Sequence, residues 1–257
     1  GTGAPLLLSG MSEISPAFGY ALQVWVSSVS LSIESFSRFG VGQSSRSGTD
    51  MDYPIVNRTI QLGNRGEGQD NMGAGVIPFC LISGKVHFLF HKTFSGRRAG
   101  HLVDFGGGGR NGESYRQTAM REFVEETETM YFSEKLQDAV RTEQRVQSQI
   151  RLLEDLFNQT LTEHPGWWCQ RKAAADGEPR DWRTYFVEIG YRDPTDMNRE
   201  WQNDAGRRFV KRRELVWIAA DRLIEIYQRE QHLLWRRVRQ LKKAKRTIRD
   251  IVQAKEY

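Results

Sequence analysis

The stretch GGGRNGESYRQTAMREFVEETET, residues 107–129, decides the fold of this chain of 257 residues. Ser114 is followed three residues later by Gln117, which is the spacing of a capping box, where each side chain bonds the backbone amide of the other residue. Apolar side chains four residues apart then share one helix face: Ala119 with Phe123, and Met120 with Val124. The stretch predicts a glycine-rich loop leading into an amphipathic helix.

The other face of this helix is acidic. Glu122, Glu125 and Glu126 lie at positions i, i+3 and i+4, within an arc of about 100°. Like charges this close repel and raise one another's pKa unless a cation neutralises them. Carboxylate oxygens suit Mg²⁺ or Mn²⁺, and the four glycines at 106–109 let the backbone approach a metal or a phosphate. The alternative is a solvated acidic face beside a flexible loop.

The spacing also resembles a family motif. Gly107, five residues, Glu113, seven residues, Arg121-Glu122-Phe123, one residue and Glu125-Glu126 follow the Nudix box, Gx5Ex7REUxEExGU with U bulky and apolar. The chain departs from the box at its end, where Glu128 and Thr129 stand in place of glycine and an apolar residue. It also has glycine where a proline often precedes the box. The departure predicts a helix exit unlike the usual glycine cap.

The resemblance implies a Nudix fold of the α/β class, a mixed sheet sandwiched between helices. It implies metal-dependent hydrolysis of a diphosphate in a nucleoside diphosphate derivative, with Mg²⁺ or Mn²⁺ as cofactor. The residues that it carries over as metal ligands are Gly107, through its carbonyl, and Glu122, Glu125 and Glu126. The implied catalytic set comprises these three glutamates with Arg121 and Glu113, which orient the loop and helix.

The box does not say which carboxylate accepts the proton of the attacking water, since the family sometimes recruits one from a later loop. Glu200, Asp204 and Glu214 are the candidates in this sequence, against an ordinary surface role for each.

The strand pattern surrounds the box. Residues 75–83 form an apolar run in which Pro78 favours an edge strand or a bulge, and residues 85–91 alternate after a Ser83-Gly84 turn, which predicts a hairpin. A short strand at 102–105, ending in the glycines, and two later strands at 182–189 and 214–219 complete the expected sheet.

Composition divides the chain into three parts. Residues 1–50 hold twelve serines and five charged side chains and form a low-charge leader, with a targeting role and a weakly ordered segment both open. Residues 51–226 form the Nudix domain, with a helical insertion at 133–180, and residues 227–257 form a basic amphipathic C-terminal helix. No membrane span is expected. Two cysteines exclude a disulfide framework and favour an intracellular location, in the cytoplasm or an organelle matrix.

Basic residues suggest two binding surfaces. The first, for substrate phosphate or ribose, comprises Lys92, Arg97, Arg98 and Arg110. Residues 206–257 contain sixteen Lys or Arg against six acidic residues, and the second surface, for a polyanion such as RNA, comprises Arg236, Arg237, Arg239, Lys242 and Lys243. An apolar stripe on the same segment, Leu234, Val238, Leu241, Ile248 and Val252, equally fits packing on the domain or docking of a partner protein.

Two functions remain open from the sequence. One is a pyrophosphohydrolase acting on a nucleotide, with the 5′ end of RNA as a candidate substrate. The other is a Nudix-fold subunit that binds RNA or nucleotides in a larger assembly with little or no turnover, using the leader, insertion or C-terminal helix to meet a protein partner. Trp167 and Trp168 can stack on a base or serve as packing residues.

Overall fold

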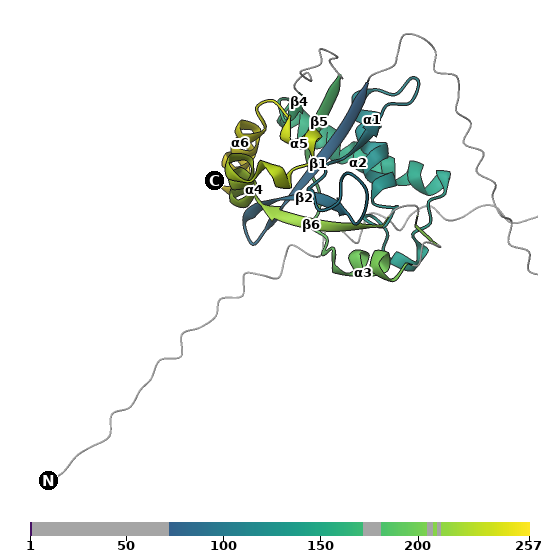
Figure 1. Ribbon diagram of the computed structural model, residues 1–257, viewed down its shortest axis with the longest axis horizontal. Coiled ribbons are helices and arrows are strands. Elements are labelled where there is room, and N and C mark those ends of the chain that lie inside the picture. Colours follow the sequence, from purple (N-terminus) through teal and green to yellow (C-terminus); the bar gives the residue numbers. More distant parts are fainter. Residues whose placement is uncertain (2–71, 172–180, 205–207, 210–211) are drawn as a thin grey trace, which may run out of the picture. The chain divides into compact units, whose positions relative to one another are not determined.

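A β-hairpin begins the part of the chain that the structure describes. The structure is a computed structural model that describes Gly1 and residues 72–171, 181–204, 208–209 and 212–257 (Figure 1). Strand β1 (Gly73–Ile82) pairs antiparallel with β2 (Lys85–Thr93). Ser83 and Gly84 join them with φ of 51° and 76°, the positive values that a two-residue type I′ turn needs. The predicted hairpin is confirmed, whereas the predicted leader lies outside the described residues.

The sheet is mixed and has six strands in the described residues. Its order is β4-β5-β1-β2-β6, with β3 also pairing with β1. The further strands are β3 (Phe105–Gly108), β4 (Trp168–Gln170), β5 (Trp182–Glu188) and β6 (Arg213–Ala219). Strands β1 and β5 are parallel, and the other pairs are antiparallel. The mixed α/β class expected from the sequence is confirmed.

Pro78 lies in the central strand, so the expected edge or bulge is wrong. The Phe79 carbonyl faces β5, since it accepts from the Ile189 amide at 2.9 Å. The backbone of Pro78 therefore faces the opposite edge of β1. There the partner of β1 changes from β3, last paired at Val76, to β2, first paired at Phe79. The missing N–H of Pro78 falls in this gap and breaks no ladder.

The glycine run forms a strand, contrary to the prediction of a strand at 102–105 that ends before the glycines. Residues 102 and 103 make only isolated bridges, and β3 runs from Phe105 through Gly108 beside β1. A Cβ atom on Gly106 would lie 2.5 Å from the Ala74 carbonyl oxygen. The absence of side chains thus lets β3 approach β1 and the ring of Trp182 closely.

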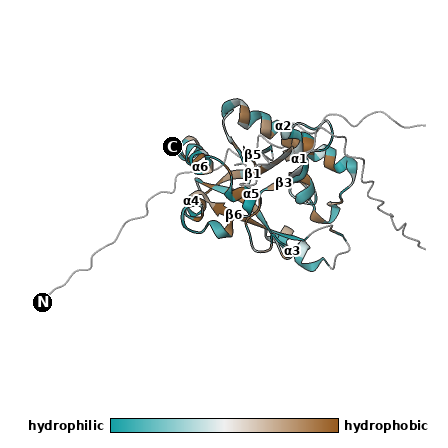
Figure 2. Cartoon of the chain, turned by 45° about the horizontal axis from the view of Figure 1, so that its top comes forward, coloured by the Kyte–Doolittle hydropathy of each residue, from teal (hydrophilic) through white to brown (hydrophobic). Residues whose placement is uncertain are grey.

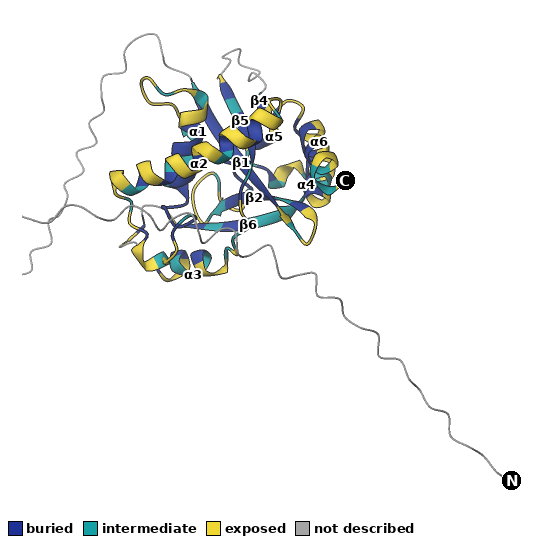
Figure 3. Cartoon of the chain, turned by 180° about the vertical axis from the view of Figure 1, so that it is seen from behind, coloured by how far each residue is buried: buried dark blue, intermediate teal, exposed yellow. Residues whose placement is uncertain are grey.

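Helices cover both faces of the sheet (Figure 1). Helices α1 (Tyr115–Glu126) and α2 (Glu143–Glu163) pack together against β1, β3 and β5. Helices α4 (Ala220–Arg229) and α6 (Ala244–Glu256) contact β2, and α3 (Thr195–Asn203) contacts β6. The helices carry hydrophilic and hydrophobic sides (Figure 2), and β1 and β2 are buried along most of their length (Figure 3). Aromatic rings fill the core, among them Phe79, Phe88, Phe105, Phe123 and Phe186.

The predicted insertion supplies both a helix and a strand. Its described residues form a 3₁₀ turn (Leu136–Asp138), helix α2 and the edge strand β4, and residues 172–180 lie outside the described part. Helix α2 buries Leu153, Phe157 and Leu161 in the common core. None of the described helices is long and apolar enough to cross a membrane.

Residues 227–257 do not form the single C-terminal helix that the sequence predicts. After α4 come a 3₁₀ turn (Gln231–Leu233), the short α5 (Arg236–Arg239) and α6. The chain breaks because residues 233–235 bond the backbone of Leu102, and because Lys243 adopts a φ of 61°. The predicted apolar stripe instead packs on the domain, since Leu234, Val238, Leu241 and Ile248 are buried in its core.

The prediction that Arg237 belongs to an exposed polyanion-binding surface is wrong. Its guanidinium is buried, donates to Asp104 Oδ1 at 2.7 Å and lies over the Trp182 ring at 4.1 Å. Asp104 has no exposed surface and also accepts from the Thr184 hydroxyl at 3.2 Å. Arg237 thus neutralises a buried carboxylate and is not free to bind a polyanion. Its neighbour Arg236 is exposed.

Replacing Arg237 with alanine should destabilise the fold strongly, because it leaves Asp104 charged and unpaired in the core. Removing one partner of a buried pair costs about 3–5 kcal/mol. Arg236→Ala is the matched control, expected to leave the unfolding midpoint in urea nearly unchanged. Equal midpoints for the two variants would contradict the buried pair.

Candidate active site

Helix α1 begins as the sequence predicts. Ser114 is the N-cap and its hydroxyl accepts from the Gln117 amide at 3.3 Å, while the Gln117 side chain accepts from the Ser114 amide at 2.8 Å. The predicted capping box is therefore confirmed. It fixes where the helix starts, and so which side chains face the glycine strand β3.

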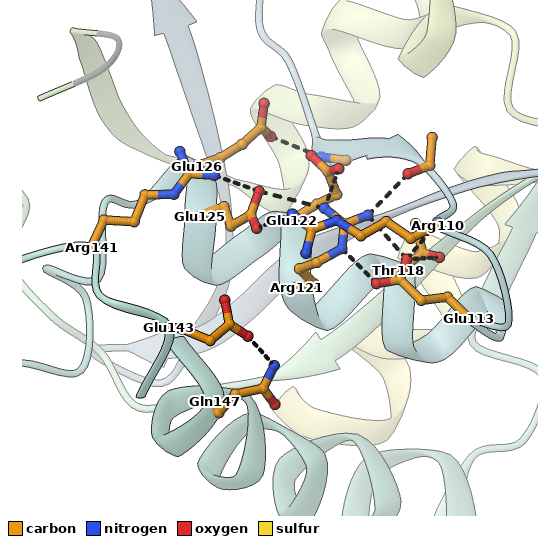
Figure 4. A network of polar contacts seen from close by, with 12 residues as sticks. Arg110, Glu113, Thr118, Arg121, Glu122, Glu125, Glu126, Arg141, Glu143 and Gln147 are labelled. Atoms are coloured by element: carbon orange, nitrogen blue, oxygen red, sulfur yellow. Dashed lines mark hydrogen bonds and ion pairs between the residues drawn. The ribbon is translucent and has the colours of Figure 1, made fainter. Parts of the chain in front are cut away.

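Arg121 ties the loop to the helix (Figure 4). Its side chain is 5% exposed and forms a fork with Glu113, with Nε to Oε1 at 2.6 Å and Nη2 to Oε2 at 3.0 Å. Nη2 also donates to the Gly108 carbonyl at 2.9 Å. Nη1 donates to Glu122 at 2.7 Å and reaches Glu125 at 3.5 Å. One guanidinium thus holds strand β3, the loop and two of the three helix carboxylates.

Glu113 is the acceptor that completes this fork. Besides Arg121, it accepts from the Arg110 amide at 2.9 Å and the Thr118 hydroxyl at 3.0 Å. Burial alone would raise the pKa of Glu113, but these hydrogen bonds hold it below the usual value. Glu113 is therefore ionised and stabilises the loop through these hydrogen bonds.

Gly107 makes room for Glu122. A Cβ atom at Gly107 would lie 2.4–2.6 Å from the carboxylate atoms of Glu122, so the two groups touch only because residue 107 has no side chain. Burial and the neighbouring charges of Glu126 and Glu125 raise the pKa of Glu122, against the opposing effect of Arg121. Arg121 therefore does not fully offset the cost of holding a buried, ionised Glu122.

Glu126 contacts two side chains that the sequence does not point to, His91 and Arg213. It accepts from the Gly106 amide at 2.8 Å and from Arg213 on β6 at 3.0 Å, and the buried His91 on β2 lies 3.4 Å away. Burial opposes ionisation of Glu126, but His91 and Arg213 hold its pKa far below the usual range. Burial lowers the pKa of His91 itself. Only the pairing of β2 with β6 brings these residues together, and the spacing along the chain gives no sign of it.

Glu125 lies between two more arginines. Arg110, which the sequence analysis assigned to substrate, donates to Glu125 at 2.7 Å. Arg141, which follows the box in the insertion, lies 2.6 Å from the other carboxylate oxygen. In Figure 4 the two arginines approach Glu125 from opposite sides. Both are more exposed than Glu125, at 57% and 29% against 13%, so they can move without unfolding the site.

The donor chemistry fits a hard divalent ion, but the side chains are not arranged around one. Glu122 lies against Gly107 and Glu126 accepts from the Gly106 amide, while Glu125 lies on the same helix, and carboxylate oxygens are the donors that Mg²⁺ and Mn²⁺ use. Within the described residues, no three carboxylate, histidine or cysteine groups are placed to hold a metal together. The carboxylates instead bond to Arg121, Arg110, Arg141 and Arg213.

The helix exit keeps the geometry of a glycine cap without the glycine. The Thr129 amide bonds the Val124 carbonyl at 3.0 Å and the Glu128 amide bonds the Glu125 carbonyl at 3.2 Å, which is the Schellman pattern. Glu128 and Thr129 adopt φ of 51° and 60°, a conformation that costs a non-glycine residue about 1–2 kcal/mol. The expectation of a different exit is therefore wrong.

Some of the predicted substrate residues line a cavity beside the box. Arg97 and Arg98 belong to a cavity of about 830 Å³ whose wall includes Arg213, the partner of Glu126. Its other lining residues include Phe94, Phe209, Arg212 and Trp235. Lys92 pairs with Glu214 across β2 and β6 and follows the buried His91, so its side chain points to the opposite face of the sheet.

The three candidates for a proton acceptor outside the box do not join the network of Figure 4. Glu200 pairs with Arg208 at 2.7 Å, and Asp204 accepts from the amides of Arg208 and Phe209 at 3.0 and 3.2 Å. Glu214 lies opposite Lys92 in the sheet. Their assignment as a base stays a prediction.

Comparison with known proteins finds similarity among solved structures. No protein-family model and no curated protein matches the chain. Among solved structures, a C. elegans Ap4A hydrolase in a binary complex is 14% identical, with a TM-score of 0.38, over 72% of this chain and 96% of that one. RenU, a Nudix hydrolase from M. smegmatis, is 12% identical, with a TM-score of 0.36, over 72% and 87%.

A NUDIX hydrolase from Nitrosomonas europaea is 15% identical, with a TM-score of 0.33, over 73% of this chain and 91% of that one. These TM-scores are too low to transfer an activity or a ligand. Function is therefore inferred from the residues of the box and from the contacts made around it.

Replacing Arg141 with glutamine should tighten Mn²⁺ binding, because it removes a positive charge that competes with the ion for Glu125. We expect a dissociation constant roughly fivefold lower by calorimetry, since a partly exposed ion pair is worth up to about 1 kcal/mol. Arg151→Gln, at an exposed position on α2, is the control. Weaker binding in Arg141→Gln would show that Arg141 supports the ion site.

Proposed function

We propose that the chain is a member of the Nudix family and a metal-dependent pyrophosphohydrolase acting on a nucleoside diphosphate derivative. The single observation that supports this most is the Arg121 network, because it uses the box residues together. Arg121 joins Glu113, the Gly108 carbonyl, Glu122 and Glu125 in one set of contacts. A solvated acidic helix face would need neither a buried arginine nor a glycine at position 107.

The cavity next to the box supports an anionic substrate that carries an aromatic ring. Four arginines line it, Arg97, Arg98, Arg212 and Arg213, and they suit phosphate oxygens. Trp235 is half-buried there with the Arg98 guanidinium 5.6 Å from its ring centroid, and Phe94 is exposed. Aromatic faces and guanidinium planes together suit a nucleobase and a phosphate chain. The 5′-triphosphate end of RNA is therefore a candidate substrate.

A bound Mg²⁺ or Mn²⁺ would neutralise phosphate charge and lower the pKa of the attacking water. The residues that would hold it are Glu122, Glu125 and Glu126 with the Gly107 carbonyl. Arg110 and Arg141 would first turn away from Glu125, which their exposure allows.

The side chains around the metal site would have different roles in proton transfer and positioning. Glu126, with a lowered pKa, stays ionised and is a poor proton acceptor. Glu122, with a raised pKa, is the better candidate to accept the proton of the attacking water. Arg121 and Glu113 keep both carboxylates and the glycine strand in place, so they position the reacting groups without exchanging protons.

The second candidate is a Nudix-fold binding subunit with little turnover. The observation in its favour is that arginines, including Arg110, Arg141 and Arg213, engage the carboxylates in this structure. If these contacts persist in solution with Mn²⁺ present, the chain would bind a nucleotide through the arginine cavity and leave it intact.

The decisive experiment is a substrate panel with Mg²⁺ or Mn²⁺. It contains ADP-ribose, dinucleoside polyphosphates, nucleoside triphosphates and 5′-triphosphorylated RNA. We expect metal-dependent product with at least one substrate, and a loss of about a hundredfold or more in Glu126→Gln, a change in keeping with removal of a catalytic carboxylate. Glu154→Gln, on the exposed side of α2, should retain full activity.

Product formation that is absent throughout the panel would favour the binding subunit. Activity equal in Glu126→Gln and the wild type would refute the assignment of the box glutamates.

A further inference from the structure

Arg183 is stacked between two aromatic rings at the end of the sheet where β4 lies. Its guanidinium is 4.2 Å from the ring centroid of Tyr115, the first residue of α1, and 4.9 Å from that of Trp168 on β4. Among the described residues, its Nε is buried without a hydrogen-bond partner. Trp168 is 37% exposed and Arg116 is exposed. The guanidinium of Arg183 thus lies between the two rings, and the Trp168 side of this stack is partly exposed to solvent.

A second group of basic residues adjoins the same edge strand. The Lys242 amide donates to the Gln170 carbonyl of β4 at 2.8 Å, and Arg171 forms a bridge with Leu241. Lys242 and Lys243 are both exposed. The turn between α5 and α6 therefore carries its lysines to β4, and Figures 1 and 3 both show β4, β5 and α5 at the same end of the sheet.

Basic side chains outnumber acidic ones on this surface among the described residues. We define the β4 surface as Tyr115, Arg116, Trp168, Arg183, Lys242 and Lys243. The Asp181 carboxylate contacts it and accepts from the Tyr115 hydroxyl. Burial raises the pKa of Tyr185 beneath it, while Arg183 and Arg116 oppose that shift. Four basic residues, Arg116, Arg183, Lys242 and Lys243, thus belong to this surface, and Arg183 contacts Trp168 directly.

We propose that the β4 surface binds single-stranded nucleic acid. An exposed aromatic ring such as Trp168 stacks on bases of any sequence, and basic side chains beside it contact the phosphates. An acidic peptide would use the charges but has no need of the open Trp168 face. Arg236 and Arg239 are exposed on α5 and are left out of this surface.

The β4 surface is separate from the cavity beside the box. It includes the first residues of α1, the helix that also carries the box glutamates. Tyr115 begins α1, and Glu122 follows seven residues later, about 10 Å along the helix axis. A strand bound at β4 can therefore continue toward the glycine loop. Binding at this surface does not depend on turnover, so its test is independent of the proposed activity.

The experiment measures fluorescence anisotropy of a labelled oligouridine RNA of about 20 nucleotides with a 5′-hydroxyl, which offers no diphosphate to cleave. The wild type should bind, and binding should weaken between about 50 and 200 mM salt. Trp168→Ala should weaken it roughly tenfold, the value of one lost stacking contact. Lys242→Gln with Lys243→Asn should lower the salt slope by about 1.4, and asparagine tolerates the positive φ at 243.

The matched control removes two exposed charges, Lys135→Gln with Arg199→Gln, from a hollow beside α3 that lies away from β4. Its affinity and salt slope should equal those of the wild type. Unfolding midpoints show whether each variant is folded. The proposal is overturned if the wild type does not bind, or if the folded Lys242/Lys243 variant binds as tightly as the control.

Discussion

The buried guanidinium of Arg121 is the constraint on which the site depends. It joins Glu113 and the Gly108 carbonyl on one side to Glu122 and Glu125 on the other. Burial opposes its charge, but these carboxylates raise the pKa of Arg121, so it is permanently ionised. Because Arg121 offers five N–H donors in a fixed plane, it sets the loop and the helix in one geometry. No lysine could replace it.

Local patterns predicted much of the fold. The hairpin, the capping box at Ser114 and the last strand, β6, follow from spacings within a few residues, and the structure confirms them. Prediction was weaker where tertiary contacts override local preference. Pro78 is tolerated in the central strand because of a gap between neighbouring strands, and the glycine run at 106–108 extends β3 because close packing favours it.

The sequence gives the number of charged residues, but it does not show which of them are buried, paired or exposed. Arg237 belongs to the same basic segment as Arg236, yet it pairs with a buried carboxylate 133 positions earlier. Arg213 and His91 meet Glu126 only through strand pairing. Conversely, Arg183 had no sequence signal, although it holds two aromatic rings together. The basic excess thus divides between core neutralisation, the carboxylate site and the β4 surface.

We propose that Glu122, Glu125 and Glu126 hold a divalent ion once Arg110 and Arg141 have turned away from Glu125. Thermal unfolding of the wild type and Glu122→Gln, each with and without Mn²⁺, tests it most directly. Without the ion, Glu122→Gln should have the higher midpoint, because burial and repulsion from Glu126 and Glu125 outweigh the pairing of Glu122 with Arg121. Mn²⁺ should raise the midpoint of the wild type above that of the variant. A wild-type midpoint that Mn²⁺ leaves unchanged would contradict the account.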